Sequence, residues 1–410
     1  MQITQNENTR FQEQAAEFVI KLGSALHNYG TSSERLESAL RKLMARLNLE
    51  GDIFASPTGL FISIGVTEHQ QTHIIRVDPG EVHLEKLALL DELSQQVIND
   101  RIHITEGVKR IDEIVNAPSR YGTVLTILSY SIASAMVCRF LDGGWREILI
   151  SGFIGTLIGL TGFFVGKRHQ TSFLFEPIAA AISSALAIII AQKIMVISVY
   201  EVTLSGLIAA VPGMTMTLAM KELATRNLVA GTVRVAWAGL LFLEVAFGFA
   251  VGTQVNKLFA MPLPEIDPAG LPNWTEWLAL LIAPFALSVR FQARPKDFGW
   301  IMIGCIISFG GARLGASYFA WEYSGFIGAF FACAVSNLIA RFKNFPAAIV
   351  LSPALLLLVP GSIGFVSVSN FLEKNILSGV AAAFSMVMVA MSIVIGLLLA
   401  NAIVPARKNI

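Results

Sequence analysis

The sequence predicts an α-helical integral membrane protein, in which ten transmembrane helices form a five-plus-five inverted repeat behind an N-terminal cytoplasmic α+β domain. Composition is the first reason, because 54% of the 410 residues are hydrophobic and only 14% are charged, against about 25% charged residues in soluble proteins. The second reason is a series of ten apolar segments, each near the ~20 residues that cross a bilayer. The third is a repeat, since Val211-Pro212-Gly213 recurs as Val359-Pro360-Gly361.

Residues 1–119 carry most of the charge and are predicted to form the cytoplasmic domain. Apolar residues at helical spacing predict a first helix that ends at Gly30. Thr31 followed by Glu34 is typical of a capping box and predicts the start of a second helix. Runs rich in Ile, Phe and Val then predict three short strands, and two more helices follow. We expect the strands at 52–55, 60–66 and 73–77, and the last two helices at 85–102 and 106–115.

The membrane part begins at residue 120 and divides into two units of five segments. The ten segments are 121–140, 148–166, 176–195, 197–217, 232–255, 274–291, 298–318, 324–340, 346–366 and 377–403. We therefore expect a first five-helix unit over 120–262, a proline-rich periplasmic linker over 263–273 and a second five-helix unit over 274–410. Because five is an odd number, the second unit must enter the membrane from the opposite side, which makes the repeat inverted.

Each Val-Pro-Gly tripeptide is a candidate break in a spanning helix. A proline inside a membrane helix leaves a carbonyl without its partner, and a following glycine lets the backbone leave the helix. Breaks of this kind form the binding sites of secondary transporters, and channels with inverted repeats exist as well. The alternative is that each tripeptide ends a helix at the membrane surface. We expect the helices at Pro212 and Pro360 to be interrupted and to approach each other.

Small residues at a spacing of four, three and four also recur in the two units. They are Gly155, Gly159, Gly162 and Gly166 in the first unit and Gly304, Ser308, Gly311 and Gly315 in the second. This spacing places small residues on one helix face, where a neighbouring membrane helix can approach closely. We interpret them as packing positions.

Lysine and arginine in the loops predict that both termini are cytoplasmic. The expected inner loops contain Lys167, Arg168, Lys221, Arg226, Arg290, Arg294, Lys296, Arg341, Lys343, Arg407 and Lys408. The outer loops contain fewer: Arg139, Arg146, Lys193, Lys257, Arg313 and Lys374. Positive charge favours the inner side of a membrane, so the domain of residues 1–119 is placed inside.

Ionisable residues inside spanning segments are costly, so each is a candidate for function. Glu244 lies about midway along the fifth segment, and its repeat mate is Ser392. A carboxylate there could carry a coupling proton; the alternative is a structural glutamate bonded to a neighbouring helix. Arg234 lies ten residues earlier, about 15 Å away along a helix, and could extend to the inner surface. Thr215, beside the first break, could hydrogen-bond a polar solute or freed backbone.

No metal ion, cofactor or nucleic acid is expected as a partner. The net charge is +1, and the three cysteines lie in or beside apolar runs without metal-ligand spacing. The histidines of the first domain are not paired with cysteines or carboxylates at ligand spacing, and no hydrolase motif occurs. The expected partners are a small-molecule solute and the lipid bilayer, and the sequence leaves a homo-oligomer open.

The ordered set of motifs resembles the threonine/serine exporter family. It comprises Tyr29-Gly30-Thr31-Ser32-Ser33-Glu34-Arg35-Leu36-Glu37, Ser56-Pro57-Thr58-Gly59-Leu60, Arg76-Val77 and the two five-span units with their Val-Pro-Gly tripeptides. The resemblance covers essentially the whole chain. It implies an exporter of small amino acids in the cytoplasmic membrane of a bacterium, driven by the proton motive force, and no enzymatic activity.

Two alternatives remain open at this point. Relatives whose two units look like separate chains are associated with export of C4-dicarboxylates such as succinate, so the solute does not follow from the resemblance. A membrane-bound hydrolase or regulator that acts through its N-terminal domain is the other. The site residues we propose for the solute and proton pathway are Pro212, Gly213, Thr215, Arg234, Glu244, Pro360 and Gly361.

Overall fold

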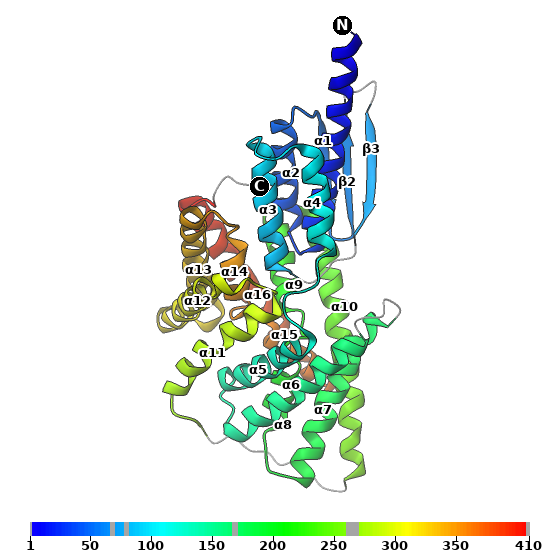
Figure 1. Cartoon of the computed structure of the whole chain (residues 1–410). Coiled ribbons are helices and arrows are strands. Elements are labelled where there is room, and N and C mark those ends of the chain that lie inside the picture. The colour runs from blue at the N-terminus through cyan, green and yellow to red at the C-terminus, as the bar shows by residue number, and fades with distance from the viewer. Residues whose placement is uncertain (1, 66–69, 78–81, 166–170, 260–269, 407–410) are drawn as a thin grey trace.

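The computed structural model describes residues 2–65, 70–77, 82–165, 171–259 and 270–406. It has two parts (Figure 1): an N-terminal unit of helices and a small sheet at one end, and a helical bundle that makes up the rest. The linker predicted at 263–273 lies mostly outside the described residues, as does Gly166.

The N-terminal unit contains α1 (Gln2–Asn28), α2 (Ser33–Arg46), β1 (Gly51–Ser56), β2 (Gly59–Ile64), β3 (Gln71–Arg76), α3 (Leu84–Ile98) and α4 (Ile104–Asn116). The predicted elements are thus confirmed in type and order. The three strands form an antiparallel sheet in the order β1-β2-β3, in which Ser56 pairs with Gly59 across a two-residue turn. Alternate strand residues such as Ile53, Leu60 and Ile62 are buried under α1 and α2.

The ends of the first two helices show one confirmed and one wrong prediction. Gly30 ends α1 as predicted, because its φ of +89° is the left-handed conformation that glycine adopts freely. The amides of Gly30 and Thr31 donate to the carbonyls of His27 and Leu26, which closes the helix end. The capping box of Thr31 and Glu34 is not formed. The residue that precedes α2 is Ser32, whose side chain makes no capping hydrogen bond.

The bundle contains α5 (Thr123–Phe140), α6 (Trp145–Val165), α7 (Phe175–Lys193), α8 (Val199–Gly206), α9 (Gly213–Ala224), α10 (Leu228–Thr253), α11 (Trp274–Arg290), α12 (Phe298–Tyr318), α13 (Trp321–Lys343), α14 (Ala348–Leu356), α15 (Gly361–Leu372) and α16 (Ile376–Ile403). Short 3-10 turns are η1 (Ser172–Leu174), η2 (Gln254–Leu258) and η3 (Pro295–Asp297). In the part of the chain that is described, eight helices or helix pairs are long and apolar enough to cross a membrane.

Two of the ten predicted segments fall outside those eight. The segment expected at 197–217 is divided into α8 and α9, and α11 has only 17 residues. Broken or short helices of this kind can still lie in a membrane when neighbouring helices cover their backbone. The molecule is therefore a multi-pass helical membrane protein, and ten spans remain a prediction.

The two halves of the bundle share backbone details at a constant offset of 148 residues. Pro212 has φ −82° and ψ 42°, and Pro360 has φ −82° and ψ 39°. Arg226 and Lys374, which precede α10 and α16, both adopt positive φ, of 65° and 63°. Side chains other than glycine and asparagine rarely adopt this conformation, so its recurrence at matching positions supports a duplication.

The predicted small residues lie at close helix contacts. A Cβ placed on Gly155 would lie 2.5 Å from Ser134 Oγ of α5, and one on Gly311 would lie 2.9 Å from the Cα of Gly328 in α13. Ser308 Oγ donates to the carbonyl of Ala354, 2.8 Å away. The packing interpretation is confirmed for these positions.

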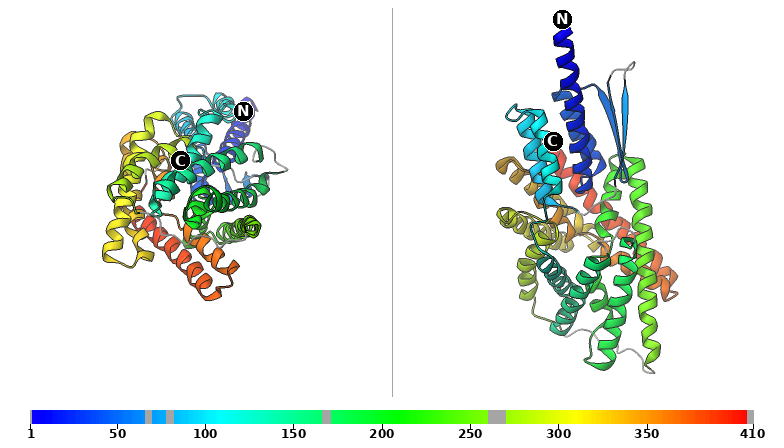
Figure 2. Two further views of the ribbon diagram at one scale, coloured as in Figure 1. Left: turned by 90° about the horizontal axis from the view of Figure 1, so that it is seen from below. Right: turned by 45° about the vertical axis from the view of Figure 1, so that its right-hand side comes forward.

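The N-terminal unit is joined to the second half of the bundle. The amides of Leu84 and Glu85, at the start of α3, donate to the carbonyls of Phe291 and Gln292 at the end of α11, at 2.9 and 3.0 Å. A helix N-terminus thus satisfies the free carbonyls of a helix C-terminus. The buried residues of the unit form one hydrophobic cluster with Ile301, Ile349 and other residues of α12–α14. In Figure 2, α10 runs from beneath the sheet to the far end of the bundle.

Candidate functional site

The two Val-Pro-Gly turns, Val211–Gly213 and Val359–Gly361, lie against each other. A Cβ placed on Gly213 would lie 2.8 Å from the nitrogen of Gly361 and 2.9 Å from its Cα. A Cβ placed on Gly361 would lie 3.0 Å from Cγ1 of Val211. The predicted interruption of the helices at Pro212 and Pro360 and their approach to each other are confirmed. A pseudo-two-fold axis in the membrane plane between them stays a prediction. We call this contact the Val-Pro-Gly crossing.

Each turn breaks its helix in the same way. The amide of Gly213 donates to the carbonyl of Val211, and that of Gly361 to the carbonyl of Val359, both at 2.9 Å. A bond between residues two apart, around a proline with φ near −80° and ψ near 40°, is an inverse γ-turn. Proline favours it because its ring fixes φ and it has no amide to donate. A new helix, α9 or α15, begins directly after each turn.

The turns leave backbone groups without intramolecular partners. Across the described residues, no hydrogen bond is accepted by the carbonyls of 208–210 or of 356–358, and none is donated by the amides of Met214, Thr215, Ser362 and Ile363. Carbonyls bind cations and ammonium groups, and amides at a helix N-terminus bind anions. The crossing therefore offers both kinds of group to a ligand.

The predicted site residues divide into two sets. Pro212, Gly213, Pro360 and Gly361 are buried at the crossing, and Thr215 lies half-buried in the first turn of α9. Arg234 and Glu244 lie on α10 and do not belong to the crossing. Arg234 is bound through Nε to Oε2 of Glu222, 2.8 Å away, so it has a partner in the protein.

Glu244 is only half-buried, although the sequence suggested the most deeply placed carboxylate. Its neighbour Phe242 packs against Gly364 of α15. Two residues further along a helix the side chain points about 200° away, so Glu244 faces away from α15. It lies within electrostatic range of Glu176 in the first turn of α7. Glu244 thus lies at the level of α15 along α10, but on the face of α10 that points away from α15.

Glu222 is a residue that sequence reasoning missed. Its side chain has no solvent exposure, and it is bound to Arg234 and to the amide of Ser33. The fourth apolar segment was expected to end at residue 217, which placed Lys221 and Glu222 in a loop. The tight turn at Arg226 and Asn227 was the available signal, because it makes α9 and α10 antiparallel and brings positions 222 and 234 together.

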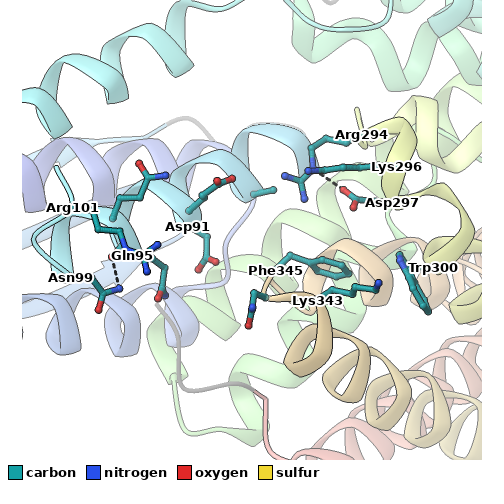
Figure 3. Close-up of a pocket in the computed structure, with 14 residues that line it drawn as sticks. Asp91, Gln95, Asn99, Arg101, Arg294, Lys296, Asp297, Trp300, Lys343 and Phe345 are labelled. Carbon is teal, nitrogen blue, oxygen red and sulfur yellow. Dashed lines mark hydrogen bonds and ion pairs between the residues drawn. The ribbon is translucent and has the colours of Figure 1, made fainter.

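A separate polar cleft of about 660 Å³ lies between the N-terminal unit and the second half of the bundle (Figure 3). Asp91, Gln95 and Arg101 line it from α3 and the turn after it, and Arg294, Lys343 and their neighbours line the other side. Arg294 is paired with Asp297 at 2.7 Å. The cleft does not include residues of the crossing.

Paired helix breaks that meet inside a helical bundle are a feature of many membrane transporters. Residues 17–256 match the model of the threonine/serine exporter family (ThrE). Residues 276–403 match a second family model, which is described as "Threonine/Serine exporter, ThrE". The chain belongs to the threonine/serine exporter family, which is a family of transporters and not of enzymes.

Curated relatives of the chain include fungal membrane proteins. The chain is 28% identical to pheromone-regulated membrane protein 10 of Candida albicans (strain SC5314) over 367 residues, which is 85% of this chain and 33% of that protein. It is 26% identical to the protein of the same name from Pichia sorbitophila over 90% of this chain and 38% of the relative. An uncharacterised protein of Schizosaccharomyces pombe is 26% identical over 85% of this chain and 48% of its own length. The chain spans a third to a half of these relatives. No solved structure matches it.

Proposed function

We propose that the protein exports threonine, serine or a closely related small amino acid across the cytoplasmic membrane of a bacterium. The N-terminal unit and both termini lie in the cytoplasm in this proposal, and the two halves of the bundle are inserted in opposite senses. Family membership supports the transport class, and the bias of lysine and arginine in the loops supports the orientation. The single observation that carries the site is the meeting of the two Val-Pro-Gly turns.

The crossing suits a zwitterion. The unbonded amides of Met214, Thr215, Ser362 and Ile363 lie at the N-termini of α9 and α15, where the helix dipole favours a carboxylate. The unbonded carbonyls of 208–210 and 356–358 lie on the other side of the turns and can accept hydrogen bonds from an ammonium group. Thr215 can bond the hydroxyl of threonine or serine. Movement of one half-helix pair against the other would expose this site to each side in turn.

Proton coupling is assigned to Glu244. The two halves share their backbone geometry at the crossing, yet the position that corresponds to Glu244 in the second half is Ser392, which cannot carry a proton. A half-buried carboxylate within electrostatic range of Glu176 can exchange a proton as the bundle moves. The role of Arg234 in this scheme is to hold Glu222 rather than to touch the solute.

One observation favours a second candidate solute. Two pairs of unbonded amides are available, one on each half-helix, and a C4-dicarboxylate such as succinate would place one carboxylate on each pair. Counterflow separates the candidates: proteoliposomes preloaded with unlabelled solute are given labelled threonine, serine or succinate. We expect accumulation of labelled threonine and serine, while accumulation of succinate alone would transfer the assignment to dicarboxylates. Absence of counterflow for all three would contradict both.

A further inference from the structure

The last turn of α9 is bound to the N-terminal unit through a buried carboxylate. Glu222 has no solvent exposure; its Oε2 lies 2.8 Å from Nε of Arg234, and its Oε1 accepts a hydrogen bond from the amide of Ser33 at 3.3 Å. Ser33 is the first residue of α2, and no side chain of its own segment caps that helix. Glu222 therefore replaces the missing cap, with the positive end of the α2 dipole directed at it.

A second ion pair lies beside the first. Lys221 Nζ is 3.3 Å from Oε2 of Glu34, and their side chains are 20% and 40% exposed. A partly exposed pair contributes little to stability, because water and salt screen it. The Glu222 contact is different, because it is buried: displacing α9 from α2 removes the acceptor of the Ser33 amide and takes the positive end of the α2 dipole away from the carboxylate. Arg234 lies on α10 and keeps Glu222 charged and in place at the end of α9.

The second half of the bundle has no counterpart to these contacts. At the offset of 148, Lys221, Glu222 and Arg234 correspond to Ser369, Asn370 and Ala382. Asn370 donates to the carbonyl of Val366 within its own helix, 3.0 Å away. The helical fold at this position thus requires no charge. The charges occur only in the half where α2 of the N-terminal unit lies against the end of α9.

The N-terminal unit is held on its other side by the second half. The hydrogen bonds from Leu84 and Glu85 to Phe291 and Gln292 attach α3 to the end of α11. The unit therefore bridges the two halves, one of which carries the half-helix α9. A bridge that spans both halves resists their relative movement for as long as its weaker attachment is closed.

We propose that the contacts of Ser33 with Glu222 and of Glu34 with Lys221 are a latch, in which Arg234 positions Glu222 and by which the N-terminal unit holds α9 closed over the Val-Pro-Gly crossing. Opening the crossing on the side of the N-terminal unit requires this latch to separate, while the attachment at Phe291 and Gln292 stays formed. The proposal rests on the proposed transport function, because it assigns α9 the movement that exposes the site.

A reversible cross-link tests the latch. Glu34→Cys and Lys221→Cys are introduced together after Cys138, Cys305 and Cys333, all buried, are replaced by alanine or serine in a variant that retains transport. A short bifunctional methanethiosulfonate then joins positions 34 and 221. We expect counterflow of threonine to fall at least tenfold on cross-linking and to return on reduction. Full counterflow in the cross-linked protein would overturn the proposal, as would failure of the two cysteines to react with one reagent.

Two further measurements make the result independent of transport. A cysteine at Thr215 is labelled by an impermeant thiol reagent applied from the side of the N-terminal unit; cross-linking should slow this labelling, and Glu222→Gln should accelerate it several-fold. The control is a cross-link between cysteines at Glu85 and Arg120, whose side chains are paired near the α11 attachment. This cross-link should change neither the rate of counterflow nor the rate of labelling at position 215. If no variant transports any solute, the transport proposal fails. The labelling rates at position 215 still show whether the latch limits access to the crossing. Equal labelling in all variants would contradict it.

Discussion

Gly213 and Gly361 lie in backbone contact where the two interrupted helices cross, but the contact is not equivalent from the two sides. A Cβ on Gly213 would meet the backbone nitrogen and Cα of Gly361 at 2.8 and 2.9 Å, which cannot move without moving α15. A Cβ on Gly361 would meet Cγ1 of Val211 at 3.0 Å and the Cα of Gly213 only at 3.6 Å. The nearest atom to that Cβ therefore belongs to a half-buried side chain and not to the backbone.

Gly213→Ala should therefore impair the protein much more than Gly361→Ala. Overpacking against backbone costs about 1–3 kcal/mol, whereas a displaced side chain costs less. We expect Gly213→Ala to lower the thermal midpoint in detergent and to reduce counterflow at least tenfold, with Gly361→Ala within about twofold of the parent. Equal effects of the two substitutions would contradict the tighter packing around Gly213.

Glu244→Gln should separate exchange from pH-driven export. Glutamine keeps the size and hydrogen bonding of the side chain but cannot release a proton. We expect counterflow to continue while export driven by an imposed pH gradient is lost. Glu176→Gln is the control, because Glu176 is a carboxylate within electrostatic range of Glu244 and is also partly buried. If Glu244→Gln exports like the parent and Glu176→Gln does not, the coupling proton belongs to Glu176.

The sequence was sufficient for what depends on local pattern. Gly30, the alternation in β1–β3 and the apolar runs predicted the elements of the N-terminal unit and most of the bundle, because periodicity and turn chemistry act within a few residues. It was not sufficient for the start of α2. The capping box at Thr31 and Glu34 has the correct residues, yet Glu34 is paired with Lys221 and the cap comes from Glu222.

The same limit applies to the candidate site. The repeat of Val-Pro-Gly predicted the breaks and their approach, since proline and glycine act on their own backbone. Glu244 was selected as an acidic residue in an apolar run, and burial cannot be read from that. Glu222 lies outside the run that was taken to span the membrane, and only the antiparallel pairing of α9 with α10 shows that it is fully buried beside Arg234.

The predicted topology can be tested at the linker between the two units and at the C-terminal end of the chain. Both termini are expected inside and the linker over residues 263–273 outside, so a single cysteine at Gly270 should react with an impermeant reagent added to intact cells. A cysteine at Ala406 should react only after the cells are opened. Reaction of both sites in intact cells, or of neither, would place them on the same side and contradict five spans in the second unit.

His27 should make the attachment of the N-terminal unit sensitive to pH. Its side chain is 4% exposed. Burial lowers the pKa of the imidazole below its usual 6.5, and the guanidinium of Arg234 lowers it further, while the carbonyls of Ser56 and Pro57 and the carboxylate of Glu222 oppose this. A histidine that is neutral when folded stabilises the fold above the unfolded pKa of ~6.5, and this stability is lost as the pH falls below that value.

We expect the amides of α1 and α2 in the full-length protein to exchange hydrogen faster, after correction for intrinsic rates, at about pH 5.5 than at about pH 7.5. His27→Gln should reduce the difference, and His73→Gln, at the more exposed β3, should leave it unchanged. A difference that persists in His27→Gln would assign the sensitivity to another group, and the first candidate is His83, whose pKa burial also lowers.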